Sequence, residues 1–121
     1  MIHNELVTYE VAQLAKEKGF NEGCLHYYQN GIVDTDGYYN HYNMCVKNIC
    51  SAPTQSLLQR WLREEKKVHI EIYPVFPSPD QVKYGRWVVA DAITKSIPIE
   101  YFDTYEQALE DALAYGLINL D

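Results

Sequence analysis

The residues of this 121-residue chain that are best suited to chemistry are its cysteines and histidines, five of which fall between positions 24 and 50. They follow the pattern Cys24-x-His26, then His41-x3-Cys45-x4-Cys50. Tetrahedral zinc takes four Cys or His ligands, so these spacings could close around one ion. The chain lacks the Cys-x2-Cys knuckle typical of such sites. We therefore expect metal-free thiols and no cofactor, with a zinc-stabilised interaction module as an alternative.

Cys50 is the best-placed candidate for a nucleophile, because it directly precedes a predicted helix that starts near Ser51. The dipole of that helix could lower the thiol pKa and favour the thiolate. No nucleophile elbow marks this or either of the other cysteines. We expect a packed cysteine at the start of the helix and a protein that is not an enzyme. A small enzyme without a recognisable motif is the alternative.

Cationic residues form a third candidate group. Arg60, Arg63 and Lys67 recur at i, i+3 and i+7, which places them on one face of a helix. Lys83 and Arg86 flank a later predicted strand and could approach that face. Arginine binds phosphate groups well, so a local anion site is one interpretation. A solvated outer face, opposite the apolar face of the same helix, is the simpler one.

Tyrosine is unusually frequent, with 11 in the chain and five within residues 27–42. Tyrosine offers rigid contact area and a hydroxyl group at low entropic cost, so this density suits a binding surface. An anionic ligand such as a nucleotide could be held there by stacking together with a cation. The predicted ligand-binding residues are Tyr38, Tyr39, Tyr42, Arg60, Arg63 and Arg86.

The net charge of −7 is unevenly distributed. Residues 51–95 carry seven bases and five acids, whereas residues 96–121 carry six acids and no base. Such an acidic chain is a poor non-specific binder of nucleic acid, which requires cation–phosphate contacts. A helix-turn-helix beginning in residues 8–20 is also disfavoured, because a predicted strand follows directly.

No apolar run approaches the ~20 residues of a membrane helix. The first ten residues, MIHNELVTYE, lack the basic segment and apolar core of a signal peptide. We therefore expect a cytosolic protein that does not bind a membrane.

The segment that should organise the fold is 51–74. Leu57, Leu58, Trp61 and Leu62 form one apolar stripe at helical spacing, with Ser51 as the predicted N-cap. Alternation with period two then predicts a strand over 68–73, which Pro74 should end.

The N-terminal half is predicted to begin with a helix that Thr8 caps and Gly19 ends. A strand over 24–29 follows, and the Asn30-Gly31 dipeptide predicts a tight turn into a return strand. Residues 38–48 show no period and are predicted to form a loop.

The C-terminal half is predicted to continue with a connection over 75–81 and a second strand over 83–94. A short edge strand over 97–102 contains Pro98. A last helix should be capped by Thr104 and closed at Gly116.

These elements predict a single α+β domain over residues 1–121. Its antiparallel sheet of three or four strands is covered by three helices, in the order α-β-loop-α-β-β-(β)-α. Sequential strands joined by a short connection usually pair antiparallel.

Three segments resemble an uncharacterised family of small proteins from phages, prophages and mobile elements of gut Bacteroidetes. They read EVAQLAKEKGF, APTQSLLQRWLREEKKVHIEIYP and TYEQALEDALAYGL. The resemblance covers both ends of the chain and implies a mobile-element protein that acts on a host component. It carries no catalytic or binding residues over to this chain.

The function predicted from these observations is non-enzymatic binding that neutralises or sequesters a host component, either a host protein or a small anionic ligand such as a nucleotide immune signal. Because a chain of this size offers few deep pockets, a small ligand would favour a homo-oligomer.

Overall fold

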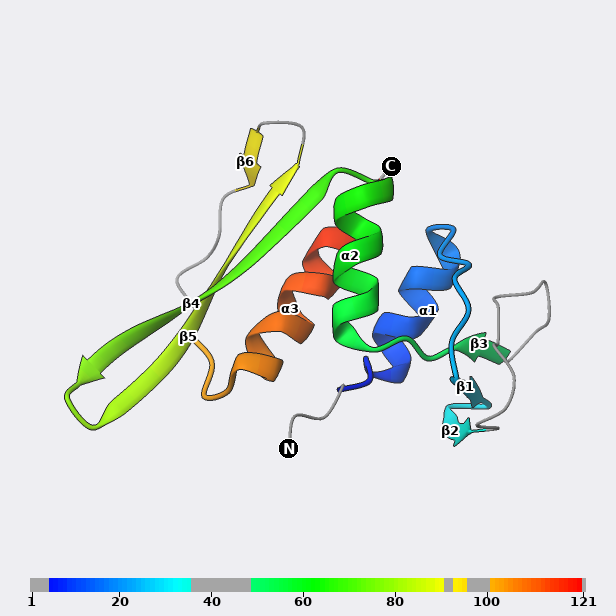
Figure 1. Ribbon diagram of the computed structural model, residues 1–121, viewed down its shortest axis with the longest axis horizontal. Helices are drawn as coiled ribbons and strands as arrows, with labels where there is room; N and C mark the ends of the chain where they lie inside the picture. The colour runs from blue at the N-terminus through cyan, green and yellow to red at the C-terminus, as the bar shows by residue number, and fades with distance from the viewer. Residues whose placement is uncertain (1–4, 36–48, 91–92, 96–100, 121) are drawn as a thin grey trace. The chain divides into compact units, whose positions relative to one another are not determined.

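The computed structural model describes residues 5–35, 49–90, 93–95 and 101–120 (Figure 1). Its contacts divide the chain into two compact units, 1–58 and 59–121, with the boundary inside a helix. The α+β class, the three helices and the antiparallel pairing of the strands are confirmed. That the whole chain is one domain stays a prediction.

The first unit begins with α1, Tyr9–Glu17, whose two ends match the sequence prediction. The Thr8 side chain accepts a backbone hydrogen bond of 3.4 Å from the first turn. At the other end Gly19 has φ of +97°, and the Phe20 amide donates to the Ala15 carbonyl at 2.9 Å. This is a Schellman ending, in which glycine supplies the left-handed conformation.

Three short antiparallel strands form the sheet of the first unit, in the order β2-β1-β3. Asn30 and Gly31 have φ of +52° and +82°, which is the type I′ turn that their sequence predicts. The strand over residues 49–51 was not predicted, because three residues are too few to show an alternating pattern of burial. The strands are β1, His26–Gln29; β2, Ile32–Thr35; and β3, Ile49–Ser51.

The central helix, α2, spans Gln55–Glu65, and its predicted cap was wrong. Ser51 belongs to β3, where it pairs with Tyr27. Thr54 takes the capping role, because its hydroxyl accepts a hydrogen bond of 3.1 Å from the Leu57 amide. The predicted apolar stripe is present: Leu58, Trp61 and Leu62 are buried and Leu57 is half-buried.

The second unit contains an antiparallel sheet in the order β4-β5-β6. The predicted connection over 75–81 is wrong, because both strands continue almost to a tight turn at residues 79 and 80. The predicted single strand over 83–94 is divided between β5 and β6. Residues 96–100 lie outside the described residues, but Phe102 forms an isolated bridge with Tyr84. The strands are β4, Val68–Ser78; β5, Gln81–Ala90; and β6, Ile93–Lys95.

Pro74 lies within β4 and does not end it. Its partner Tyr84 donates to and accepts from Phe102, both at 2.9 Å, so the Tyr84 backbone points away from β4. Pro74 and Tyr84 are therefore a non-hydrogen-bonded pair, and the nitrogen of Pro74 faces the outer edge of the sheet. No ladder bond is lost there, which is why proline is tolerated.

The last helix, α3, spans Tyr105–Ile118, and Thr104 caps it through a bond of 3.1 Å from the Gln107 amide. The prediction that Gly116 closes this helix was wrong. Gly116 lies inside it, where a Cβ atom would stand 3.4 Å from Val68 and 3.7 Å from Leu62. A Cβ atom would therefore fit there in ordinary van der Waals contact, whereas a larger side chain would meet the neighbouring residues of the second unit. Within the described residues, no helix is both long and apolar enough to cross a membrane.

The β4–β5 ribbon has two different faces. Helix α3 packs on the face that contains Val68, Ile70, Tyr84 and Arg86, which we call the α3 face. Side chains alternate along a strand, so the intervening residues form the opposite face. We call that face the open face. Its residues are His69, Glu71, Tyr73, Val75, Lys83, Gly85, Trp87 and Val89.

Candidate functional site

The tyrosines that were predicted to bind a ligand, Tyr38, Tyr39 and Tyr42, lie outside the described residues. Their neighbour Tyr28 is described, and it has a structural role. Its hydroxyl donates to the Val7 carbonyl at 2.6 Å, and its ring lies 5.5 Å from the ring of Tyr9. Tyr28 therefore joins β1 to the start of α1.

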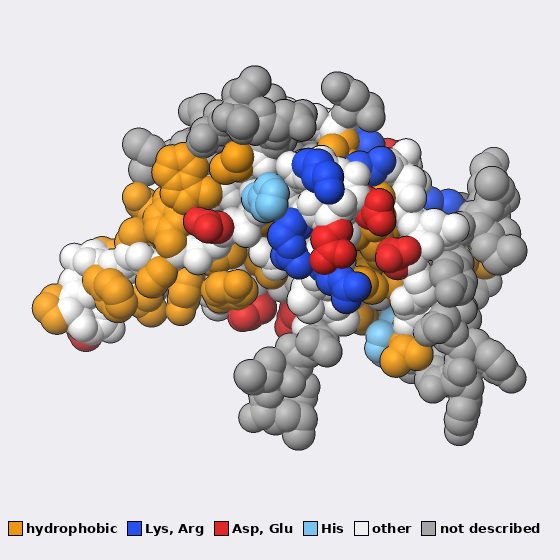
Figure 2. All heavy atoms as spheres, turned by 45° about the horizontal axis from the view of Figure 1, so that its top comes forward, with side chains coloured by type: hydrophobic (Ala, Val, Ile, Leu, Met, Phe, Trp, Pro, Cys, Tyr) orange, Lys and Arg blue, Asp and Glu red, His pale blue; other side chains and the backbone are white. Residues whose placement is uncertain are grey.

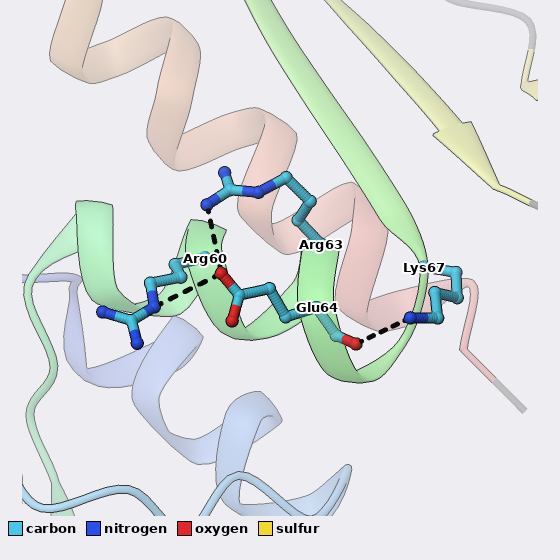
Figure 3. A network of polar contacts seen from close by, with 4 residues as sticks. All are labelled: Arg60, Arg63, Glu64 and Lys67. Carbon is cyan, nitrogen blue, oxygen red and sulfur yellow. Dashed lines mark hydrogen bonds and ion pairs between the residues drawn. The ribbon is translucent and has the colours of Figure 1, made fainter.

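The cationic stripe of α2 is exposed and largely engaged with its own helix (Figure 3). Arg60 Nε and Arg63 Nη2 lie 3.4 Å and 3.6 Å from the same carboxylate oxygen of Glu64. The Lys67 ammonium donates to the Glu64 carbonyl oxygen at 3.1 Å. Exposed pairs of this kind contribute little to stability, about 0–1 kcal/mol. The stripe fits a solvated outer face on which both guanidinium groups can still be reached.

Arg86 lies apart from that stripe, beneath α3. It is 7% exposed, its Nε bonds to the Asp111 carboxylate, and its guanidinium carbon stands 4.7 Å from the Tyr115 ring centre. Its Nη1 has no hydrogen-bond partner among the described residues. An arginine paired and stacked in this way fixes the contact between β5 and α3. The structure therefore brings Arg60 and Arg63 together around Glu64 and places Arg86 in a different contact.

The two described cysteines are buried free thiols. Burial raises the pKa of the Cys24 thiol from its usual 9.0 to about 11, although a hydrogen bond with Ser51 acts in the opposite direction. Burial also raises the pKa of Cys50, against the lowering effect of Lys16. Both thiols are protonated at neutral pH, so neither is an activated nucleophile. The expected packed cysteine agrees with the burial of Cys50, and this residue belongs to β3, ahead of the Thr54 cap that begins the helix.

The zinc alternative is tested only in part, because His41 and Cys45 lie outside the described residues. Cys24 and His26 are described, as is Cys50. Across the described ranges, no three His, Cys, Asp or Glu side chains gather in a way that could hold a metal ion. The zinc module therefore stays a prediction.

Two of the clefts lined by described residues of the first unit contain a cysteine, Cys24 in one and Cys50 in the other. The larger, of about 260 Å³, is lined mainly by apolar residues that include Leu6, Leu25 and Leu57. The smaller, of about 110 Å³, is lined by Tyr9, Lys16 and their neighbours, and the Lys16 ammonium donates to the Ile49 carbonyl at 2.6 Å. Neither cleft contains an activated nucleophile, since the cysteine in each is held protonated.

The open face of the second unit is the strongest candidate for a binding surface. Hydrophobic side chains gather over the β4–β5 hairpin, whereas charged side chains gather over α2 (Figure 2). Trp87 is 45% exposed in the middle of β5. Tyr73 lies across Gly85, where an added Cβ atom would stand only 2.4 Å from the tyrosine ring. Gly85 therefore lets the Tyr73 ring lie flat against the sheet beside Trp87.

The polar residues of the open face are balanced in charge. Glu71 stands directly opposite Trp87, while Lys83 forms an ion pair with Asp103. Aromatic rings bordered by one acid and one base suit contact with a protein better than contact with phosphate groups. This face was not predicted, because the run Trp87-Val88-Val89-Ala90 shows no alternation that would mark one exposed side. The alternation of His69, Glu71 and Tyr73 could have identified it, because Trp87 pairs with Glu71 and therefore lies on the same face as these three residues.

Comparison of the chain with protein-family models, with curated proteins and with solved structures finds no match.

Proposed function

We propose that the protein is a non-enzymatic binding protein of a phage or mobile element that captures a host protein in the bacterial cytoplasm. The observation that carries this proposal is the exposure of Trp87 beside Tyr73 on the open face. Tryptophan and tyrosine are the side chains that most often dominate the binding energy of protein interfaces. A sheet face that presents both without a covering helix, among the described residues, supports a docking role.

Charge supports a protein partner with a basic surface. The chain has a net charge of −7, and residues 101–120 contain four acids and no base. Long-range attraction would therefore raise the rate at which a basic partner associates with the chain. Binding of a nucleotide signal by Tyr38, Tyr39 and Tyr42 together with Arg60 or Arg63 stays a narrower prediction. The buried position of Arg86 disfavours a contribution of this residue to such a site.

The test is affinity capture from host lysate with the wild-type protein and two matched variants. Trp87→Ser removes the exposed ring of the open face, while Leu25→Ser removes an exposed apolar side chain of the first unit. We expect the wild type and Leu25→Ser to retain one host protein, with the same ratio of host protein to captured bait. We expect Trp87→Ser to bind this protein at least tenfold more weakly, because loss of one central aromatic residue costs ~2 kcal/mol or more.

Equal retention of that host protein by Trp87→Ser would contradict the role of the open face. Turnover of a substrate by the purified protein would contradict the non-enzymatic assignment. Far-ultraviolet circular dichroism of each variant checks that the fold is unchanged.

A further inference from the structure

The end of the β4–β5 hairpin extends beyond the helix that covers the rest of the ribbon (Figure 1). Helix α3 begins beside Tyr84, where the rings of Tyr84 and Tyr105 lie 6.1 Å apart. From there it runs away from the hairpin turn, past Arg86 and on to Val68. Among the described residues of the second unit, no helix therefore lies beneath the ten residues Pro74–Lys83, which we call the arm.

The arm continues the apolar side of the ribbon past the end of its cover. Phe76 is 69% exposed and Val82 is 37% exposed. Phe76 follows Val75 on β4, within the stretch where the register of the hairpin shifts between Val75 and Ser78. By alternation, Val82 lies on the same side as Tyr84, which is the α3 face. The arm thus presents an apolar surface of the kind that α3 buries further along the ribbon.

The arm has no net charge, unlike the chain as a whole. Its charged residues are Asp80 and Lys83. Asp80 accepts a hydrogen bond of 2.8 Å from the Ser78 hydroxyl, and Lys83 is paired with Asp103. Contact with phosphate groups requires available cations, so nucleic acid does not suit this surface.

We propose that the arm is the surface through which a second copy of this chain binds. A two-fold symmetric contact places the same patch of both copies together, so a charged patch would repel itself. The arm avoids that repulsion in a chain of net charge −7, and each arm supplies the apolar cover that the other lacks. This inference concerns the α3-face side of the hairpin and does not depend on the host protein proposed for the open face.

The outer edge of β4 is poorly suited to the same role. Pro74 has no amide hydrogen to offer there, and the Gln59 side chain already donates to the Ile70 carbonyl at 3.1 Å. Strand-to-strand pairing along this edge is therefore interrupted at two points. The contact is expected to be made by side chains of the arm and not by extension of the sheet.

The size of the arm sets the expected affinity. Stable interfaces bury about 800 Å² and use about 20–30 residues on each partner. A ten-residue arm supplies less, so we expect a weak dimer with a Kd of about 10–100 µM. The protein should be a mixture of monomer and dimer in that range of concentration.

Sedimentation velocity between 1 and 300 µM tests the proposal. We expect the weight-average sedimentation coefficient to rise with concentration and to change little between 0.05 and 0.5 M NaCl. Phe76→Ser and Val82→Lys should each weaken dimerisation at least tenfold, because the first removes apolar contact and the second places like charges together. Leu25→Ser and Trp87→Ser, which change exposed apolar residues elsewhere, should leave the dimer unchanged.

A wild-type protein that stays monomeric to 300 µM would overturn the proposal. So would a dimer that survives both arm substitutions, or one that Leu25→Ser weakens equally. Capture of the host protein by Phe76→Ser should remain at the wild-type level, so failure of the dimer and failure of the open-face proposal are distinguishable.

Discussion

The substitution Trp61→Ala tests the central place of α2 most sharply, because the chain contains a second tryptophan that serves as its control. Trp61 is 7% exposed, and the Lys66 ammonium lies 5.4 Å from its ring centre. Removal of a buried tryptophan costs about 3–5 kcal/mol, since lost burial and an unfilled cavity add together. Loss of the exposed cation–π contact adds about 0.5–1 kcal/mol.

Trp87→Ala is the matched control, because Trp87 is about half-exposed and leaves no enclosed cavity. We expect it to cost only about 1–2 kcal/mol. For a chain of this length, 1 kcal/mol lowers Tm by roughly 3–6 °C, so Trp61→Ala should lower Tm by roughly 10–35 °C. Thermal unfolding followed by circular dichroism at 222 nm measures both. Equal losses for the two variants, or no loss for Trp61→Ala, would refute the central place of this helix.

Two further predictions concern the cysteines and the packing of α3. Alkylation of Cys24 and Cys50 by iodoacetamide should be slow at pH 8, because both thiols have raised pKa values, and the Cys24 rate should increase through about pH 11. Between pH 9.0 and about pH 11 the unfolded chain loses the Cys24 proton while the folded protein keeps it, so this thiol should lower the free energy of unfolding as pH rises above 9.0. Fast alkylation at pH 8 would contradict both expectations. Gly116→Ala should be neutral or raise stability by up to about 1 kcal/mol, because alanine has a higher helix propensity than glycine. Its Cβ would stand 3.4 Å from Val68, which is an ordinary van der Waals contact. Gly116→Leu should instead cost about 1–3 kcal/mol by overpacking, and chemical denaturation that ranks the two variants in the opposite order would contradict the packing argument.

Local rules predicted those parts of the fold that local chemistry decides. The Thr8 and Thr104 caps, the Gly19 ending and the Asn30-Gly31 turn were all predicted correctly, because each depends on residues within one turn of chain. The apolar stripe of α2 was equally visible, since burial of one helix face imposes a period.

The errors arose where tertiary context decided the outcome. Pro74 was expected to end β4, but its nitrogen faces the outer edge of the sheet, which depends on strand order. Gly116 resembles a helix ending, yet α3 continues past it to Ile118 while Gly116 packs beside Val68, which lies far away in sequence. Ser51 resembles a cap but is used by β3.

The candidate site was less predictable than the fold. Arg86 was grouped with Arg60 from sequence spacing alone, and its contact with Asp111 depends on how α3 packs on β5. The exposure of Trp87 likewise depends on which face of the ribbon α3 covers, and no local pattern encodes that choice. Tyr38, Tyr39 and Tyr42 stay predicted ligand-binding residues.

The central claim is that Trp87 on the open face contacts a host protein, and the fluorescence of Trp87 itself tests this directly. The variant Trp61→Phe keeps a core aromatic ring and leaves Trp87 as the single tryptophan of the chain. Acrylamide quenching should be efficient for the free variant, because the ring is 45% exposed. Addition of the captured host protein, with its own tryptophans replaced by phenylalanine, should shift the emission to shorter wavelength and reduce quenching at least twofold. Unchanged emission and quenching in a complex proven to form by sedimentation would contradict the claim.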